Sequence, residues 1–196
     1  MNIINGVYSE DYNQVGGCIM KNILFIASEG VPFIKTGGLA DVVGSLPKGI
    51  DKEYYDVRVI LPKYNCMHQD KKDMLHYRDH FYMEFNWKNE YVGILEAEYD
   101  GIKYYFIDNE YYFSGERPYS DPRYDLEKFK PYCDNALFEI EKFAFFSKAA
   151  LSILPVIGFR PDLIHCHDWQ TGLIPVYLHE RFAGGEFYRG IKTVMT

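Results

Sequence analysis

Short continuous apolar runs alternate along the chain with stretches of helical spacing. Three of the runs, 22–28, 56–61 and 161–166, are typical of strands buried on both faces of a parallel sheet. Between the first two, apolar residues recur at i, i+3, i+4 and i+7, which predicts a short helix packed on the sheet through Leu39, Val42, Val43 and Leu46. A strand, a helix and a second strand form a right-handed βαβ unit, so the pattern predicts a doubly wound α/β fold.

The middle of the chain differs in composition, and its sequence predicts strands rich in tyrosine and phenylalanine over residues 80–109. Asp100-Gly101 between two of them predicts a type I′ hairpin turn, and hence an antiparallel insertion or extension of the sheet. Asp134 is a good N-cap for a long helix, whose expected apolar positions are Leu137, Ile140, Phe143, Ala144, Ala150 and Leu151. A second helix is expected over 171–182 and a last strand over 191–196. We therefore expect one mostly parallel, Rossmann-like sheet with helices on both faces and an antiparallel hairpin extension.

Length and charge narrow the class of protein. The chain has 196 residues, enough for one well-buried α/β domain, and its 47% hydrophobic content is that of a globular protein. A net charge of −7 argues against nucleic acid or an anionic membrane surface as the main partner. There is no apolar run of membrane-spanning length and no signal peptide in the first 20 residues, and four cysteines lack paired spacing. We expect a cytoplasmic protein with reduced thiols.

The predicted topology indicates where a ligand binds. In doubly wound sheets ligands lie beyond the carboxyl ends of the strands, which selects residues 29–38, 62–63 and 167–169. We therefore predict that Lys35, Gly38 and Asp168, far apart in the sequence, lie along one rim of the domain.

The first of these segments contains two adjacent glycines, Gly37 and Gly38, preceded by Lys35. Glycines let a backbone approach a ligand closely, and helix-terminal amides beside a lysine favour a phosphate or a sugar oxygen. The alternative, a tight turn beside a solvated lysine, stays open on physical grounds. Neither a dinucleotide-binding glycine motif nor a P-loop motif is present.

The third segment follows a strand with a polar cluster, His165-Cys-His-Asp-Trp-Gln-Thr-Gly172. A ligand-facing role is plausible for some of these groups, since unsatisfied polar groups are costly to bury. Metal binding is disfavoured, because adjacent side chains of a strand point to opposite faces and no second cluster completes a site. For His165 alone, a hydrogen-bonded core histidine is the better interpretation. Most aromatic residues are expected in the core, but Tyr119 and Tyr124 lie in loops and are freer to face a ligand.

Two motifs together resemble the bacterial glycogen synthase and plant starch synthase family. They are Lys35-Thr-Gly-Gly-Leu-Ala-Asp-Val42, after a first strand ending in Ser-Glu, and His165-Cys-His-Asp-Trp-Gln-Thr-Gly-Leu-Ile-Pro175. The resemblance covers residues 21–196, including 134–135 and 143–148, and leaves 1–20 as an N-terminal extension. It implies the N-terminal half of a two-domain GT-B glycosyltransferase. It also implies a retaining, metal-free and cofactor-free transfer of glucose through an oxocarbenium-like state.

The resemblance assigns roles residue by residue. Lys35 matches a lysine that contacts ADP-glucose, Gly37 and Gly38 match loop amides beside the sugar and phosphate, and Asp168 matches the cleft carboxylate, the catalytic candidate. Three further substrate-binding candidates are Asp41, Tyr119 and His167. The partners implied are ADP-glucose as donor, an α-1,4-glucan or glycogen as acceptor, and a C-terminal GT-B domain.

The chain stops short of the family's histidine-asparagine pair and of its diphosphate-binding C-terminal residues. We therefore expect residues 21–196 to be a catalytic domain cut before its partner domain, and to be inactive alone. A glucan- or nucleotide-binding module without turnover is an alternative, and so is another GT-B transferase. The reading frame beyond Thr196 would separate the enzyme from the module. Whether the donor carries ADP or UDP is not decided by these residues.

Overall fold

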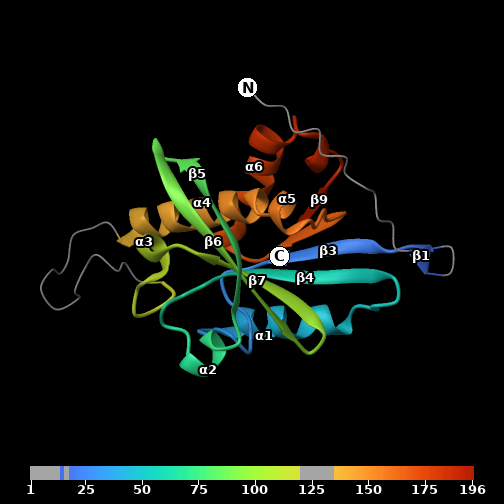
Figure 1. Ribbon diagram of the computed structural model, residues 1–196, viewed down its shortest axis with the longest axis horizontal. Coiled ribbons are helices and arrows are strands. Elements are labelled where there is room, and N and C mark those ends of the chain that lie inside the picture. The colour runs from blue at the N-terminus through green and yellow to red at the C-terminus, as the bar shows by residue number, and fades with distance from the viewer. Residues whose placement is uncertain (1–13, 16–17, 120–134) are drawn as a thin grey trace, which may run out of the picture.

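The computed structural model describes residues 14–15, 18–119 and 135–196. Their centre is a seven-stranded sheet with the order β5-β6-β7-β4-β3-β8-β9 (Figure 1). Its strands are β3 (Lys21–Ile26), β4 (Tyr55–Pro62), β5 (His76–Phe85), β6 (Lys88–Tyr99), β7 (Ile102–Asp108), β8 (Leu163–Cys166) and β9 (Lys192–Met195). A separate antiparallel pair consists of β1 (Gln14–Val15) and β2 (Cys18–Ile19).

The parallel part of the sheet confirms the three predicted buried strands. β3 lies between β4 and β8 and is parallel to both, with Ile23 opposite Val57 on one side and Leu163 on the other. Leu24 and Ile26 of this central strand are fully buried. Because β3, β4, β7, β8 and β9 run in one direction, their carboxyl ends share one edge of the sheet.

The antiparallel extension is also confirmed, and it starts earlier than residue 80. β5, β6 and β7 are joined by two hairpins, and β7 pairs antiparallel with β6 but parallel with β4. Asp100 and Gly101 both have positive φ, 51° and 69°, as a type I′ turn requires. Asn86 and Trp87 turn the other hairpin with φ of 50° and 60°.

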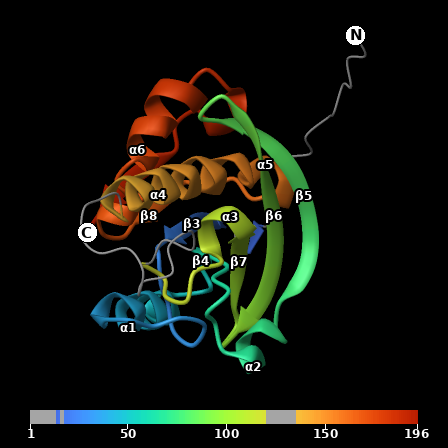
Figure 2. The ribbon, with the colours of Figure 1, turned by 90° about the vertical axis from the view of Figure 1, so that its left-hand side faces the viewer.

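Helices cover both faces of the sheet. They are α1 (Gly38–Ser45), α2 (Gln69–Lys72), α3 (Glu110–Phe113), α4 (Asn135–Ser152), α5 (Leu154–Ile157) and α6 (Ile174–Tyr177). Shorter 3₁₀ turns span Leu46–Gly49, Trp169–Thr171 and Glu186–Tyr188, and a π-helical turn spans Leu178–Phe182. Figure 2 shows α4, α5 and α6 on one side of the sheet and α1 on the other.

The predicted apolar stripe of α1 is wrong in part. Val42 and Leu46 are 48% and 45% exposed, and the helix buries Ala40, Val43 and Gly44 instead. A Cβ at Gly44 would lie 2.7 Å from the carbonyl oxygen of Val31. The loop after β3 therefore packs against the backbone of α1, and the buried face consists of small residues.

Two other helix predictions need correction. In α4, Phe143, Ala150 and Leu151 are buried as expected, but Leu137 and Ile140 are 65% and 57% exposed. The expected N-cap, Asp134, lies outside the described residues. The single helix predicted over 171–182 is broken into a 3₁₀ turn, α6 and a π-helical turn, and α6 has a proline in its first turn. Proline has no amide hydrogen to continue the preceding turn.

The described residues include the side chains of two of the four cysteines, and the helices among them can be examined for membrane-spanning length. Cys66 and Cys166 are free, whereas Cys133 and the side chain of Cys18 lie outside the described part of the chain. Among the helices that the structure describes, none is long and apolar enough to cross a bilayer.

Candidate functional site

The loop after β3 and the segment after β8 leave the same edge of the sheet, because these neighbouring strands are parallel. This arrangement confirms that Lys35, Gly38 and Asp168 lie on one rim. Between the two segments is a hollow of about 540 Å³, which we call the carboxyl-edge hollow. Its described lining residues are Glu29, Tyr119, Glu139, Ile140, Asp168, Trp169 and Gln170.

Asp168 has an unusual backbone at this rim. Its φ of 62° and ψ of 177° lie in a region that is otherwise almost restricted to glycine. Holding a residue with a Cβ there costs about 1–3 kcal/mol. The Asp168 amide donates to the carbonyl oxygen of Thr196 at 2.7 Å, and its carboxylate accepts the amide hydrogen of Trp169 at 2.7 Å. These bonds hold an exposed carboxylate at the mouth of the hollow.

Glu29 is the functional candidate that the sequence motifs missed. It is only 3% exposed, although it follows β3 in a loop. Its Oε2 accepts hydrogen bonds from the backbone amide and the hydroxyl of Thr36, the latter at 2.9 Å. Its Oε1 accepts a hydrogen bond from the Tyr119 hydroxyl at 3.3 Å. The buried carboxylate thus links the loop at Thr36 to the segment at Tyr119. The sequence shows only that a glutamate follows the first strand, and it gives no sign of these two partners.

Tyr119 lies in the hollow as predicted, while Tyr124 lies outside the described residues. The Tyr119 hydroxyl lies 2.9 Å from the Ser28 Oγ, and its ring is 6.0 Å from that of Phe143 in α4. Burial raises the pKa of Tyr119 to about 12, and the nearby Glu29 carboxylate also raises it. The phenol therefore stays protonated at neutral pH, as its hydrogen bond to the Glu29 carboxylate requires.

The glycine loop leaves open space at the rim. A Cβ at Gly38 would meet nothing within 4 Å, and one at Gly37 would lie 3.9 Å from Glu29 Oε1. The described packing therefore does not require glycine at either position. α1 begins at Gly38 without a side-chain N-cap, so its first amide groups have no partner within the helix. Space beside free amides suits the close approach of a polar ligand.

Lys35 and Asp41 form an ion pair at the same rim. The Lys35 ammonium lies 2.7 Å and 2.8 Å from the two carboxylate oxygens of Asp41, and both side chains are more than half exposed. Neither belongs to the lining of the hollow. Lys35 can leave this exposed pair for another anion at little cost, because surface ion pairs contribute little to stability.

His167 is placed in a layer beneath the rim. It is 2% exposed, and its ring stacks on His165 at 4.0 Å and on Phe25 at 5.3 Å. The Thr196 hydroxyl lies 3.1 Å from Nε2 of His165 and 3.3 Å from Nδ1 of His167. Burial lowers the pKa of His167 to about 4, with a smaller contribution from His165. The structure gives this imidazole no surface on the hollow, so its direct contact with a substrate stays a prediction.

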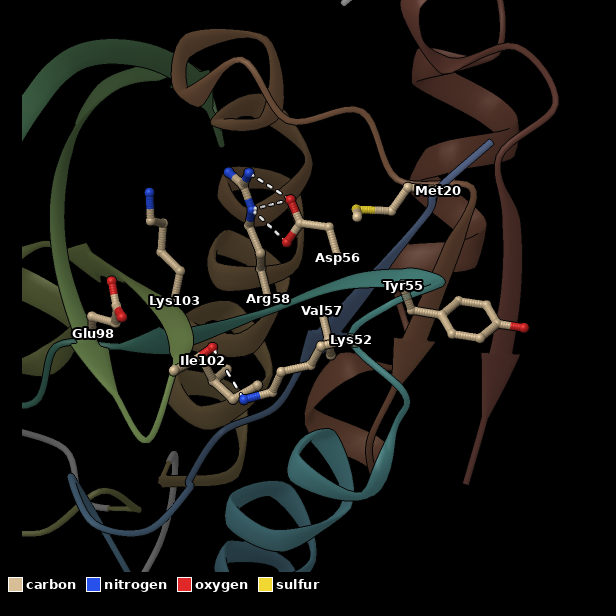
Figure 3. Close-up of a pocket in the computed structure, with 10 residues that line it drawn as sticks. Met20, Lys52, Tyr55, Asp56, Val57, Arg58, Glu98, Ile102 and Lys103 are labelled. Atoms are coloured by element: carbon tan, nitrogen blue, oxygen red, sulfur yellow. Dashed lines mark hydrogen bonds and ion pairs between the residues drawn. The ribbon is translucent and has the colours of Figure 1, made fainter. Parts of the chain in front are cut away.

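A second hollow, the amino-edge hollow, lies at the opposite ends of the parallel strands (Figure 3). It has about 320 Å³ and is lined by Met20, Lys52, Tyr55, Asp56, Val57, Arg58, Glu98, Gly101, Ile102 and Lys103. Arg58 donates to both oxygens of Asp56 and to the Tyr105 hydroxyl, and Lys52 donates to the carbonyls of Asp100 and Gly101. The charges of Arg58 and Asp56 are therefore already paired within the fold.

Nothing in the described residues brings together three or more histidine, cysteine, aspartate or glutamate side chains suited to a metal ion. His165 and His167, which flank Cys166, stack on each other and bond to Thr196. The polar side chains that line the carboxyl-edge hollow are three carboxylates, a phenol, the indole of Trp169 and the carboxamide of Gln170, and the backbone amides of the glycine loop lie at the same rim. Such a set can neutralise a positive charge on one side and bind an anionic oxygen on the other.

Comparison with known proteins gives one consistent family. The family model for the starch synthase catalytic domain matches residues 22–196. A glycogen synthase of Lachnospira eligens is 60% identical over 177 residues, which are 90% of this chain and 34% of that protein. A glycogen synthase of Desulforamulus reducens is 47% identical over 178 residues, 89% of this chain and 33% of its own length. The chain therefore spans about a third of the length of the curated relatives it matches.

A solved structure agrees with the sequence comparisons. The catalytic domain of starch synthase IV from Arabidopsis thaliana, bound to ADP and acarbose, superposes with a TM-score of 0.70 at 28% identity. The match covers 90% of this chain and 33% of that one. The α/β architecture with its mostly parallel sheet is thus shared with a protein of the same class.

Proposed function

Because this chain belongs to the family of starch synthase catalytic domains, we propose that it supplies one side of a glucosyltransferase active site. The reaction transfers glucose from a nucleotide sugar, ADP-glucose in our proposal, to the non-reducing end of an α-1,4-glucan with retention of configuration. The observation that carries the proposal is the carboxyl-edge hollow. It combines the strained Asp168, the buried Glu29 with its partner Tyr119, and a glycine loop on one rim.

The charges of the groups at the rim determine which step of the proposed reaction each group can assist. An oxocarbenium-like sugar gains positive charge as its bond to phosphate breaks, and the exposed Asp168 carboxylate can stabilise that charge. The leaving phosphate gains negative charge, which the Lys35 ammonium and the amides at the start of α1 can stabilise. The Tyr119 hydroxyl donates its one hydrogen to Glu29, so toward a substrate it can accept a hydrogen bond from a sugar hydroxyl.

Residues 21–196 are proposed to be one domain of a larger enzyme, with residues 1–20 as an extension. The matched relatives are about three times as long as the matched segment. The described residues form one wall of the site, and we assign the facing wall to a C-terminal GT-B domain. Nucleotide sugar and glucan would then be held between the two walls.

The transfer of radiolabelled glucose to glycogen by the complete protein that carries this chain tests the proposal. ADP-glucose and UDP-glucose are compared at equal concentration, with glycogen omitted as the control. We expect glycogen-dependent incorporation that is faster from ADP-glucose. Binding of glycogen or ADP without any incorporation from either donor would support a binding module and refute the enzyme.

A further inference from the structure

Lys142 in α4 is buried to an unusual degree for a lysine. Its side chain is 1% exposed, and lysine is almost never fully buried unless it is paired. Its ammonium lies 2.5 Å from Glu139 Oε1, one turn earlier in the helix, and near the rings of Phe138 and Phe143. It also donates a hydrogen bond to the backbone carbonyl of Pro118 at 3.0 Å. A buried ammonium in α4 therefore holds a loop that is 24 residues away in the sequence.

That loop segment carries Tyr119 into the carboxyl-edge hollow. Pro118 has no amide hydrogen, so its carbonyl is the one polar backbone group by which the fold can hold this residue. The ring of the next residue, Tyr119, lies against Phe143, the neighbour of Lys142 in α4. Two adjacent residues of the helix thus fix the position of two adjacent residues of the loop.

The contacts continue from Tyr119 to the glycine loop. The Tyr119 hydroxyl bonds to Ser28 and Glu29, and Glu29 accepts the amide and hydroxyl hydrogens of Thr36. Thr36 is followed directly by Gly37 and Gly38. Each link is a hydrogen bond or a ring contact between described groups, so the path from α4 to the rim has no gap.

We propose that Lys142 is a positioning residue, which holds the Pro118–Tyr119 segment and, through Tyr119 and Glu29, the Thr36–Gly38 loop in the geometry that receives the substrate. The inference rests on the proposed function for its kinetic consequence, but not for the structural coupling itself. Lys142 does not belong to the described lining of the hollow. It acts through Tyr119, which does line the hollow.

The same helix offers a matched control. Lys148 donates to the carbonyl of Glu84 in β5 at 2.5 Å, so it also bonds a helix lysine to a distant backbone oxygen. Glu84 belongs to the antiparallel extension and not to the rim. Lys142→Met and Lys148→Met each remove one such bond, and only the first interrupts the path to the glycine loop.

Amide hydrogen exchange in the complete protein tests the coupling without reference to activity. We expect Lys142→Met to speed exchange in peptides covering 114–119 and 29–38, whereas Lys148→Met should speed it only near β5 and α4. Lys142→Arg, which keeps the charge and its donors, should retain protection at 29–38. Unchanged exchange at 29–38 in a folded Lys142→Met variant would overturn the inference, whatever the enzyme's activity. If that variant does not fold, Lys142→Gln takes its place in the same comparison.

Kinetics provide the second readout, through a double-mutant cycle with Tyr119→Phe. We expect Lys142→Met to lower kcat/KM by between about twofold and thirtyfold, the usual range for coupling through a packed network. Because the effect passes through the Tyr119 hydroxyl, it should shrink in the Tyr119→Phe background. Equal losses in both backgrounds would show that Lys142 acts by another route and overturn the inference. A wild-type protein that transfers no glucose would refute the proposed function, yet the exchange result would still decide the coupling.

Discussion

The two ends of the parallel strands satisfy their charged groups in different ways. At the amino edge, Arg58 has two oxygens of Asp56 and a tyrosine hydroxyl as partners, and Lys52 has two carbonyls. At the carboxyl edge, Asp168 is exposed in a backbone conformation that suits glycine, and Gly38 of the loop faces open space. At the amino edge Arg58 and Asp56 pair with each other, whereas the carboxyl edge keeps an exposed carboxylate on a strained backbone.

This difference indicates which of the two hollows is the better candidate for a ligand-binding site. Strain of about 1–3 kcal/mol persists only where the surrounding structure enforces it, and such sites cluster where proteins bind or react. The amino-edge hollow has charged residues but little for a ligand to gain, because binding there would first break Arg58–Asp56. The hollow with the strained carboxylate, rather than the one with more charges, is therefore the functional candidate.

The largest expected effect comes from Asp168→Asn in the complete protein. The amide keeps the size of the side chain but removes the charge, which stabilises the transition state more than the bound substrate. We expect kcat to fall at least about a hundredfold with little change in KM for the donor. Asp56→Asn at the amino edge is the control and should keep kcat within about twofold while lowering the melting temperature. Steady-state kinetics with both variants would refute the catalytic role if Asp168→Asn kept near-normal kcat or failed to fold.

A smaller effect of a different kind is expected for Lys35→Ala. A lysine–phosphate contact exists before bond cleavage as well as during it, so its loss weakens donor binding. We expect KM for the nucleotide sugar to rise about tenfold, with a smaller change in kcat. Lys48→Ala, which removes an exposed lysine paired with Asp100 instead of one at the rim, should not raise KM. A fall in kcat at unchanged KM for Lys35→Ala would contradict this assignment.

The buried imidazoles beneath the rim predict a pH dependence of stability. The pKa of His167 is lowered to about 4 in the folded protein, from an ordinary value near 6.5, chiefly by burial. Between these values the unfolded chain binds a proton that the folded chain does not, so the free energy of unfolding falls as pH falls from about 6.5 to about 4. Denaturant unfolding across this range should show a shallower slope in His167→Gln. An unchanged slope would contradict the placement of His167.

The smallest effect is expected for Asp168→Gly, which tests the backbone strain at this residue separately from the role of its carboxylate. Asp168→Gly relieves the unfavourable φ and ψ but increases the entropy of the unfolded chain, so the net gain in stability should be about 1 kcal/mol or less. Activity should be lost as in Asp168→Asn. Thermal unfolding gives the first quantity and the transfer assay the second. A clear loss of stability would show that the Asp168 side chain is structural, through its bond to Trp169.

Sequence patterns predicted the sheet better than the helices. A continuous apolar run such as Asn22–Ser28 indicates a strand that is buried on both faces of a doubly wound sheet. The helix prediction assumed that every apolar residue at helical spacing is buried, and Val42 and Leu46 are exposed instead. The actual face of α1 depends on how closely Gly44 approaches Val31, which is a tertiary contact without a local signal. The rim itself was predictable, because the carboxyl ends of parallel strands meet.

The polar network at the rim could not be predicted in the same way. Glu29 and Lys142 belong to ordinary-looking segments, and their importance depends on burial and on partners distant in sequence. The strain at Asp168 likewise has no sequence signature, since aspartate is not the residue expected at such a φ and ψ. The sequence motifs predicted which loops lie at the rim. The hydrogen bonds that link these loops are visible only in the folded structure.

The most direct test of the account locates the ligand. Amide hydrogen exchange of the complete protein is measured with and without saturating ADP-glucose, and peptides from the two edges are compared. We expect added protection at 29–38 and 166–170, around the carboxyl-edge hollow, and none at 52–58 or 98–103. Protection at the amino edge alone, or none at either edge when the donor is bound, would contradict it.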